Sequence, residues 1–456
     1  MLRHPASGRI WRGLGMGGEW TTPIEELIDT GDLVINDGYR AKNSELSTDG
    51  LPFARAQNIN NGFHFENADC FPELGLDKVG IKISQPGDVV FTSKGTVGRF
   101  AFVREDTPRF VYAPQLCFWR SLNHKKIHPR WLYYWMQSRE FFVQYSGVAG
   151  QTDMAEYVSL RDQRRMHITL PPLPEQRAIA HILGTLDDKI ELNRQMNQTL
   201  EAIARALFKS WFVDFDPVRA KAEGGRMKDE IADLFPDEFV DSELGEIPKG
   251  WAIGTLGDVA THPRRGIQPN DIEPSTPYIA LEHMPRHCIA LTDWGTADDL
   301  QSNKFEFKKG EILFGKLRPY FHKVGVAPLN GVCSTDIVVI TPLTENWFGF
   351  VLGHVSSSVF VKYTNAGSTG TKMPRTSWNE MARYAVVMPP ETVAEAFTRQ
   401  VRPLVDRIIA AIHESRTLAA LRDTLLPKLI SGELRVPEKM TQDLQDSQDL
   451  QDKKSC

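Results

Sequence analysis

The chain has 456 residues, 41% of them hydrophobic, so it is long enough for about three domains with packed cores. Its formal net charge of −5 differs from that of a small basic DNA-binding domain, although a local basic face on such a chain can still bind nucleic acid. The five cysteines form no C-x-x-C pair, so the sequence indicates neither a zinc knuckle nor a disulfide framework, and it fits a reducing cytoplasm.

Residues 1–17 are rich in glycine and arginine and lack the apolar segment of a signal peptide. We expect either a flexible leader or an upstream start that the natural protein does not use. The sequence has no run of about 18 apolar residues, so it predicts no transmembrane helix. These features predict a cytoplasmic protein.

Residues 18–170 form the first predicted globular region. Its segments are short, β-like and separated by Gly, Pro and Asn. We predict strands over Val89–Thr92 and Arg99–Val103, on either side of a turn at Lys94–Gly98. A helix is predicted over Pro129–Met136, because proline is tolerated in the first turn, where its missing N–H costs little. The region is therefore expected to mix α and β structure.

A hinge followed by a long helix is predicted for residues 171–213. Three prolines within Pro171–Pro174 predict an extended hinge, because proline continues neither a helix nor a central strand. A helix of about 35 residues is expected from Glu175 onward, spanning roughly 50 Å. Its apolar residues recur at the heptad steps of four and three, at Ile179, Leu183, Leu186, Ile190, Leu200, Ala204, Leu207 and Trp211. Asn193 and Asn197 interrupt this seam near its middle, where polar residues cost stability but fix register and partner number.

The remaining chain repeats this order. Residues 214–250 predict a linker with aromatic anchors, and residues 251–388 a second globular region, which opens at Trp251 as the first opens at Trp20. A second helix is predicted within residues 389–436, from about Thr392 to Ser431, with Pro403 and Pro427 bending or breaking it and Gly432 as its C-cap. Its seam comprises Phe397, Val401, Leu404, Ile408, Ala411, Leu418, Leu425 and Leu429, weakened by Ser415 and Arg422. The low-complexity tail, residues 437–456, is expected to be disordered.

Three motifs of the first region recur in the second. Pro52–Ile59 recurs as Pro277–Met284, and Gly87–Phe91 recurs as Gly310–Phe314. Ser159-Leu160 followed by Pro171-Pro172 recurs, at the same internal spacing, as Ser377-Trp378 followed by Pro389-Pro390. Two helices of similar length can pair antiparallel and place one globular region at each end. A duplicated unit on a helical spacer suits a protein that reads two separated marks on one object, and DNA is the commonest such object.

Catalytic signatures are missing from the sequence. It has no G-x-x-x-x-G-K-[ST] loop, no H-E-x-x-H motif and no G-x-S-x-G elbow. The Asn-Pro-Pro-aromatic motif of adenine methyltransferases is also missing, and the twelve histidines never adopt a ligand-like spacing. The sequence therefore favours a reader or a scaffold over an enzyme.

Base edges in DNA are read by Arg, Lys, Asn and Gln side chains, and phosphates are held mainly by Arg and Lys. In the first region the candidates for these contacts are Arg40, Lys42, Arg55, Gln57, Asn58, Lys94, Arg99 and Gln151. In the second region they are Arg264, Arg265, Gln268, His283, Lys316, Arg318, Lys372 and Arg375. The alternative for each is a solvated surface charge, and Arg55 and Asn58 are equally explained as internal hydrogen-bonding residues beside a strand.

Three segments resemble the conserved regions of the specificity subunits of type I restriction-modification systems. They lie within Leu170–Asp187, which contains Pro-Pro-Leu-Pro-Glu-Gln-Arg, and at Leu207–Val218 and Leu425–Gly432. The resemblance covers about residues 18–436, and the central motif is highly specific. Two departures indicate that the halves contact partners or DNA differently: the second helix starts with Pro389-Pro390-Glu391-Thr392, and Asp153-Met154 is matched by Lys372-Met373.

The resemblance implies an α+β protein, with two α/β target recognition domains in a pseudo-twofold arrangement, separated by two long antiparallel coiled-coil helices. It implies double-stranded DNA as ligand, two methyltransferase (M) subunits that use S-adenosylmethionine, and restriction (R) subunits that use ATP and Mg. The chain would bind no cofactor or metal and would not be an enzyme, whereas the assembled complex is a DNA adenine methyltransferase and endonuclease. Expected partner contacts are Glu175, Gln176, Arg177, Arg194, Arg205, Lys209 and Trp211.

The function predicted from these observations is recognition of a bipartite, asymmetric DNA target. Each recognition domain would bind one half-site in the major groove, and the helices would set the gap between the two halves. The main alternative is a duplicated coiled-coil scaffold without nucleic-acid binding, for which Arg194, Arg205 and Lys209 are simply solubilising residues. A self-contained methyltransferase or nuclease is a third possibility, and the missing motifs argue against it.

Overall fold

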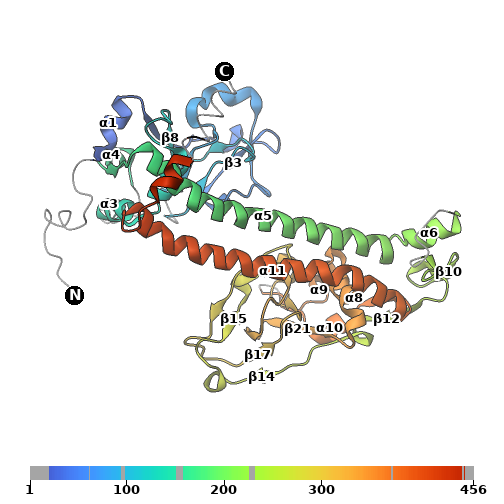
Figure 1. The fold of residues 1–456 in the computed structure, drawn as a ribbon. Helices are drawn as coiled ribbons and strands as arrows, with labels where there is room; N and C mark the ends of the chain where they lie inside the picture. Colours follow the sequence, from blue (N-terminus) through green and yellow to red (C-terminus); the bar gives the residue numbers. More distant parts are fainter. Residues whose placement is uncertain are drawn as a thin grey trace. The chain divides into compact units, whose positions relative to one another are not determined.

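The computed structural model describes residues 20–60, 62–93, 98–149, 158–224, 232–370, 373–443 and 446. It divides into two compact units: unit 1 comprises Met1–Asp188 and Ala419–Cys456, and unit 2 comprises Lys189–Leu418. Each unit combines one globular region with part of each of two 40-residue helices, α5 (Leu173–Phe212) and α11 (Glu391–Ile430), drawn in green and red in Figure 1.

Unit 1 is built around a four-stranded antiparallel sheet of order β2-β8-β5-β6. A second sheet, β4-β3-β7, pairs β3 with β7 in parallel, and β1 pairs with β9. The strands are β1 (Thr21–Pro23), β2 (Leu33–Asp37), β3 (Leu51–Ala54), β4 (Cys70–Phe71), β5 (Val89–Thr92), β6 (Phe100–Phe102), β7 (Val111–Tyr112), β8 (Leu116–Ser121) and β9 (His167–Thr169). The helices are α1 (Ile24–Asp29), η1 (Asn43–Glu45), η2 (Ala56–Asn58), η3 (Glu73–Lys78), η4 (Gly80–Lys82), α2 (Pro129–Trp135), α3 (Arg139–Ala149) and α4 (Leu160–Arg164).

The core of unit 1 lies on both faces of this sheet. Every residue of β5 and β8 is buried, which explains why both strands are nearly continuous apolar runs rather than alternating ones. One face packs on a cluster that includes Trp119, Trp131 and Phe141, and the helix ends contribute Leu183 of α5 and Leu429 of α11 to the same cluster. The first recognition region is thus fixed where α5 begins and α11 ends.

Unit 2 repeats this plan. Its four-stranded antiparallel sheet has the order β13-β21-β18-β19, and its five-stranded sheet, β14-β17-β20-β15-β16, pairs β15 with β20 in parallel. The strands are β10 (Phe239–Ser242), β11 (Gly245–Pro248), β12 (Ala252–Thr255), β13 (Ala260–Thr261), β14 (Gly266–Ile267), β15 (Pro277–Ile279), β16 (Gly295–Thr296), β17 (Lys304–Phe307), β18 (Ile312–Gly315), β19 (Val324–Val326), β20 (Gly331–Cys333), β21 (Ile337–Pro342) and β22 (Ala385–Met388). The helices are α6 (Asp216–Ala222), η5 (Leu256–Asp258), η6 (Pro269–Asp271), η7 (Leu281–His283), η8 (Pro319–Phe321), η9 (Glu345–Trp347), α8 (Phe348–Val355), α9 (Ser358–Ala366) and α10 (Trp378–Ala382).

The core of unit 2 contains the opposite helix ends. Phe208 and Phe212 of α5 pack with Val393 and Phe397 of α11 against the recognition region. Phe212 meets Phe397 edge to face at a centroid distance of 4.8 Å. The second recognition region is therefore fixed where α11 begins and α5 ends.

The repeated motifs occupy equivalent elements, which confirms the duplication. Gly87 and Gly310 precede β5 and β18 with φ of 91° and 87°, a left-handed backbone that glycine adopts without steric cost. Ser159 and Ser377 cap α4 and α10, accepting hydrogen bonds from the backbone N–H groups three residues on at 3.2 and 3.3 Å. The predicted strands at Val89–Thr92 and within Arg99–Val103 are confirmed, as is the helix that Pro129 opens.

The prolines affect the long helices less than predicted. Helix α5 begins at Leu173, so Pro174 lies in its first turn, where its missing N–H costs little. The expected break at Pro403 or Pro427 is wrong, because α11 continues through both. Both prolines lie on the exposed side of the helix, where water can bond the carbonyl groups that their rings leave without a donor. Gly432, with φ of 73°, follows the end of α11 as predicted.

The helices run antiparallel within each unit. In unit 2, Asn193 Nδ2 donates to Glu414 Oε2 at 2.9 Å and Ser415 Oγ at 3.2 Å, while the later Phe208 of α5 meets the earlier Phe397 of α11. In unit 1, Asp187 accepts from Arg422 at 2.7 Å. The buried Asn193 therefore gives the seam a specific polar pairing, as its position predicted.

The segment predicted as a linker is folded where the structure describes it. It contains α6 and the β10–β11 hairpin, and its aromatic anchors Phe215 and Phe235 are buried in the core of unit 2. Residues 438–443 of the predicted disordered tail are helical, and residues 444, 445 and 447–456 lie outside the described residues. The leader, residues 1–17, also lies outside them.

Candidate nucleic-acid interface

The second recognition region gathers five of its predicted cations. The turn after β18 runs beside residues 374–376: Lys316 accepts a backbone hydrogen bond from Thr376 at 3.0 Å, and the Arg318 N–H donates to Pro374 O at 2.7 Å. Leu317 and Arg375 form an isolated antiparallel bridge between the two segments. The backbone thus places Lys316, Arg318 and Arg375 together.

The loop after β13 adds two arginines to this group. Burial lowers the pKa of His262, and the positive charges of Arg264, Lys316 and Arg265 lower it further, so all three cations lie around this histidine. The imidazole Nδ1 bonds Val339 O at 2.8 Å, which fixes the ring against the sheet. We call Arg264, Arg265, Lys316, Arg318 and Arg375 the basic cluster.

Two carboxylates partly offset this charge. Glu311 forms an ion pair with Arg265, and Asp336 lies 3.5 Å from Arg375, whose side chain is 53% exposed. Two donors of the cluster, Arg265 Nε and Arg318 Nε, are buried without a hydrogen-bond partner among the described residues. The cluster therefore retains net positive charge, which suits contact with phosphates.

The remaining candidates of the second region lie elsewhere. Gln268 is exposed at the start of η6. The Nδ1 of His283 accepts the backbone N–H of Ala280 at 2.9 Å, so this ring caps the turn that contains η7. Lys372 lies outside the described residues.

In the first region a smaller group surrounds η2. Arg99 Nη1 lies 3.4 Å from Ala56 O and 3.3 Å from Ile59 O, and Gln57 is exposed between these carbonyls. Arg55 forms an ion pair with Asp69 at 2.6 Å and lies over the Phe53 ring. These contacts bring Arg55, Gln57 and Arg99 to one turn.

Asn58 belongs to the interior instead. It is 5% exposed, its Oδ1 accepts the Arg55 N–H at 2.9 Å, and its Nδ2 donates to His64 O at 2.8 Å. We therefore set it aside as a base contact, because its amide already serves the internal turn. Arg40 and Lys42 are exposed on the separate loop after β2, and Lys94 and Gln151 lie outside the described residues.

The sequence prediction missed Lys323, which is the counterpart of Arg99. Both residues precede the last strand of the four-stranded sheet, and Lys323 Nζ donates to Leu281 O as Arg99 donates to Ala56 O. The carbonyl acceptors occupy the same place in the repeated motif. The turn of the second region is one residue longer, and this shift hid the match in the sequence.

Comparison with known proteins identifies the architecture. The family model for the type I restriction modification DNA specificity domain matches residues 25–202. The specificity subunit of type I restriction enzyme MjaIX from Methanocaldococcus jannaschii is 26% identical over 438 residues, covering 91% of this chain and 94% of the relative. The HindI specificity subunit from Haemophilus influenzae is 25% identical over 434 residues, covering 82% and 92%. Over most of its length the chain is thus similar to type I specificity subunits.

A solved structure supports the same fold. The S subunit of a type I restriction-modification system from M. genitalium matches with a TM-score of 0.53 at 13% identity, covering 90% of this chain and 95% of that one. The fold is accordingly that of a type I specificity subunit, and we call the two globular regions the first and second recognition domains.

Two predicted partner-contact residues of this chain are internal. Gln176 is 1% exposed: its Oε1 accepts the His128 N–H at 2.9 Å, and its Nε2 donates to Lys126 O at 3.0 Å and Pro171 O at 2.8 Å. Trp211 is 6% exposed and packs on Phe397. Both are set aside as partner contacts, because these interactions hold the recognition domains on the helices.

The other partner-contact candidates keep part of their surface in solvent. Glu175 and Arg177 are half-buried at the start of α5. Arg194, Arg205 and Lys209 are exposed farther along α5, where they form ion pairs with Glu191, Glu201 and Asp214. All three pairs lie within one or two turns of the same helix or its end.

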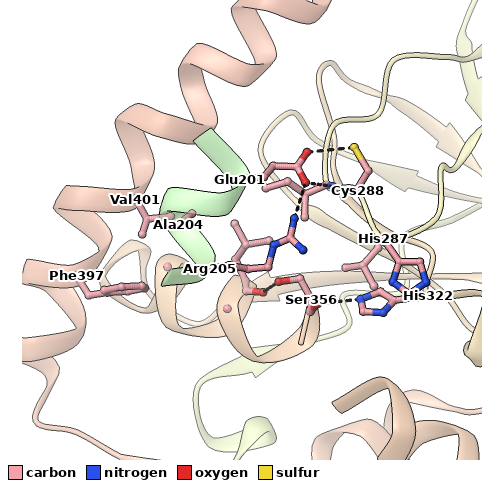
Figure 2. Close-up of a pocket in the computed structure, with 14 residues that line it drawn as sticks. Glu201, Ala204, Arg205, His287, Cys288, His322, Ser356, Phe397 and Val401 are labelled. Carbon is pink, nitrogen blue, oxygen red and sulfur yellow. Dashed lines mark hydrogen bonds and ion pairs between the residues drawn. The ribbon is translucent and has the colours of Figure 1, made fainter. Parts of the chain in front are cut away.

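A small pocket in unit 2 lies where the second recognition domain packs against α5 (Figure 2). The buried Glu201 carboxylate accepts from the backbone N–H groups of Ile289 and Ala290 at 3.1 Å, and Cys288 Sγ lies 3.1 Å away. Burial raises the pKa of Cys288 to about 12, so it stays a thiol at neutral pH and is a poor nucleophile. The hydrogen bonds of Glu201 therefore dock the second recognition domain on α5.

The described residues show no group of three or more His, Cys, Asp or Glu side chains that could hold a metal ion. Within the same residues, no helix combines the length and the apolar character needed to cross a membrane.

Proposed function

We propose that this chain is the DNA-recognition subunit of a type I restriction-modification complex, and that it binds a bipartite, asymmetric target. One observation carries the proposal: the two recognition domains share a topology but present different side chains at equivalent turns. Arg99 in the first corresponds to Lys323 in the second, and the exposed Gln57 to the exposed Glu282. Two different readers on one scaffold suit two different half-sequences.

Both domains would contribute polar contacts to recognition. In the second domain, the basic cluster would hold phosphates and set the register of the domain on the duplex. In the first domain, Arg99 and Gln57 would act around η2, and Arg55 would hold that turn through its ion pair with Asp69. Correct base pairs in each half-site would contribute about 1–3 kcal/mol each, and joining the halves in one chain adds an effective-concentration gain.

The two long helices would set the spacing of the half-sites. Each has 40 residues, which corresponds to about 60 Å at about 1.5 Å per residue. Half-sites one DNA turn apart lie about 34–36 Å from each other, within the reach of such helices. The gap in the target would then be a property of helix length.

The bond-making steps belong to partners in this proposal. Two methyltransferase subunits would bind S-adenosylmethionine and flip the target adenine, and restriction subunits would use ATP and Mg to cleave unmethylated DNA. The exposed residues Arg194, Arg205 and Lys209, with Glu175 and Arg177, are the proposed contacts for these subunits. The chain itself would act without catalysis, in the cytoplasm.

Methylation mapping tests the proposal. The chain is co-expressed with a cognate methyltransferase subunit, and methylated adenines are mapped across the genome of the host. We expect a split motif, of which one half changes when residues 18–170 are exchanged for those of a relative and the other half changes when residues 251–388 are exchanged. A continuous motif, or a motif that neither exchange alters, would contradict it.

Salt dependence separates this proposal from a scaffold without nucleic-acid binding. Binding that neutralises phosphates releases counterions and weakens steeply as salt rises. Affinity for a split-motif duplex is measured at several salt concentrations, with a duplex that lacks one half-site as the control. A scaffold predicts no specific complex with either duplex at any salt concentration.

A further inference from the structure

The turn between β18 and β19 exposes an aromatic side chain next to a second ring that lies against two arginines. Tyr320 is 49% exposed, and its ring meets Phe321 edge to face at 4.7 Å. The guanidinium of Arg286 lies 4.0 Å from the centre of the Phe321 ring, and that of Arg318 lies 6.0 Å from it. We call Arg286, Arg318, Tyr320 and Phe321 the tip cluster.

The tip cluster sits on a backbone that is held rigidly. Arg318 and His322, on either side of η8, have φ of 52° and 51°, a region that costs a non-glycine residue of order 1–3 kcal/mol unless its surroundings impose it. The Arg318 N–H bonds Pro374 O at 2.7 Å. The His322 carbonyl accepts the His287 N–H at 2.9 Å, and its Nε2 donates to Ser356 O at 2.8 Å. Three separate segments therefore fix the turn that presents Tyr320.

A single exposed aromatic residue needs no explanation by itself. This one differs because Arg318, beside it in the chain, also belongs to the basic cluster, and Arg286 lies on its ring partner. An exposed aromatic ring on a fixed turn, packed against a ring that carries two guanidinium groups, combines stacking with phosphate neutralisation. Side chains that enter a base step use the same combination, a wedge together with cations on the neighbouring phosphates. The charge makes DNA the occupant that fits this surface.

We propose that Tyr320 inserts at a base step of the half-site bound by the second recognition domain, with Arg286 and Arg318 on the flanking phosphates. This inference rests on the proposed function. The corresponding turn of the first domain, residues 93–99, reads Ser-Lys-Gly-Thr-Val-Gly-Arg and carries no aromatic residue. The insertion is therefore specific to one half-site, so only that half of the target is distorted.

A fluorescent base reports this distortion. The chain, assembled with its methyltransferase subunit, is titrated onto duplexes of the mapped target that carry 2-aminopurine at a non-methylated position in one half or the other. Unstacking raises 2-aminopurine fluorescence, so we expect a rise only in the half-site of the second domain. The Tyr320→Ala variant loses this rise and binds about 5- to 150-fold more weakly, which corresponds to the loss of one base–aromatic stack worth about 1–3 kcal/mol.

Matched variants separate stacking from folding and from charge. Tyr320→Phe keeps the ring and should retain the signal and the affinity, and Leu343→Ala, which trims an exposed apolar residue of the same domain, should behave as the unaltered chain. The slope of log affinity against log salt should be unchanged in Tyr320→Ala and shallower in Arg286→Ala and Arg318→Ala, because only the arginines release counterions.

Three results would overturn the inference while the proposed function stands: an unaltered complex that methylates the split target without any fluorescence change in that half, a Tyr320→Ala complex with full affinity and signal, or a Tyr320→Phe complex that loses both. An unaltered complex that binds no split target at all overturns the proposed function together with the inference.

Discussion

The two recognition domains place a carboxylate at the same point, at the start of the central strand of the four-stranded sheet. Asp88 accepts the backbone N–H of Gln85 at 2.9 Å, and Glu311 accepts that of Lys308 at 2.7 Å, each three residues earlier in the chain. The turn before this strand is therefore the same in both domains, although the acidic residue differs by one methylene group.

The partners of these carboxylates differ. Asp88 is fully buried, and its two carboxylate oxygens accept hydrogen bonds from Nε and Nη2 of Arg120 in β8 at 2.6 and 2.7 Å. Glu311 pairs with Arg265, from the loop after β13, and accepts from Thr341 at 2.8 Å. A buried charge must be paired, but any element that reaches it can supply the partner. In the second domain this requirement brings Arg265 into the basic cluster, so an internal constraint also shapes the surface that is proposed to contact DNA.

Removing each arginine gives the largest expected effect. The Arg120→Leu variant leaves the Asp88 carboxylate buried without a cationic partner, with only the Tyr112 hydroxyl and the Gln85 N–H donating to it, so the first domain should lose about 3–5 kcal/mol. Arg265 is 27% exposed against 8% for Arg120, so solvent screens its pair with Glu311 more strongly, and Arg265→Leu should cost the second domain less. Hydrogen exchange of β5 and β18 in denaturant measures each domain separately, as a chain of two units requires. Equal losses in the two variants would show that burial does not set the difference.

The next largest loss of stability is expected from removing the hydrogen bonds that fix each domain on its helix. Gln176 of α5 makes three hydrogen bonds, two with the segment before α2 (His128 N–H and Lys126 O) and one with Pro171 O. Thr398 of α11 makes two, from the N–H of Gly349 in the first turn of α8 and to Asn346 O before that helix. Gln176→Ala strands three backbone groups and should cost about 2–3 kcal/mol, somewhat more than Thr398→Val. The exposed Gln195→Ala is the control, with a change below about 0.5 kcal/mol. Unfolding in guanidinium chloride measures all three.

A buried histidine should make the second domain sensitive to acid. Burial lowers the pKa of His354 to about 3, and its Nε2 has no hydrogen-bond partner among the described residues. The unfolded chain binds a proton near the ordinary pKa of about 6.5, whereas the folded chain does so only near 3, so stability falls as the pH drops through this window. Trp135 occupies the corresponding position in the first domain, counted from the helix-capping residues Ser138 and Ser357.

Replacing His354 by phenylalanine should therefore flatten the dependence of β18 protection on pH between about 6 and 3. The first domain keeps its own acid sensitivity, because burial lowers the pKa of His128 to about 4 and that residue is unchanged. Hydrogen exchange at β5 is thus the internal control. If β18 protection in the variant falls with pH as steeply as before, His354 does not cause the acid sensitivity.

Local features of this fold could be predicted from the sequence. The repeated Gly87 and Gly310, the caps Ser159 and Ser377, and the start of α2 at Pro129 follow from rules that need only a few neighbouring residues. The path of α11 through Pro403 and Pro427 could not be predicted, because it depends on which side of the helix faces solvent, and that is set by the fold.

The candidate site divides in the same way. Residue type selected Lys316, Arg318 and Arg375, but their grouping depends on contacts with residues 374–376 that lie more than 50 positions along the chain. Asn58 and Gln176 have the residue types of contact residues, yet both amides serve internal turns. Tyr320 was not among the predicted contact residues, because the sequence alone does not show whether an aromatic residue in a turn is exposed.

The smallest predicted effects separate structural from ligand-binding arginines. Arg375 is exposed and lies 3.5 Å from Asp336, whereas Arg55 is bound to Asp69 at 2.6 Å and lies over Phe53. We expect Arg375→Ala to leave stability unchanged and to reduce the salt slope of DNA binding by about 1. Arg55→Ala should leave that slope unchanged and cost at most about 1 kcal/mol of stability, since exposed pairs contribute little. The reverse pattern would place the phosphate contact in the first domain and leave the basic cluster without its proposed role.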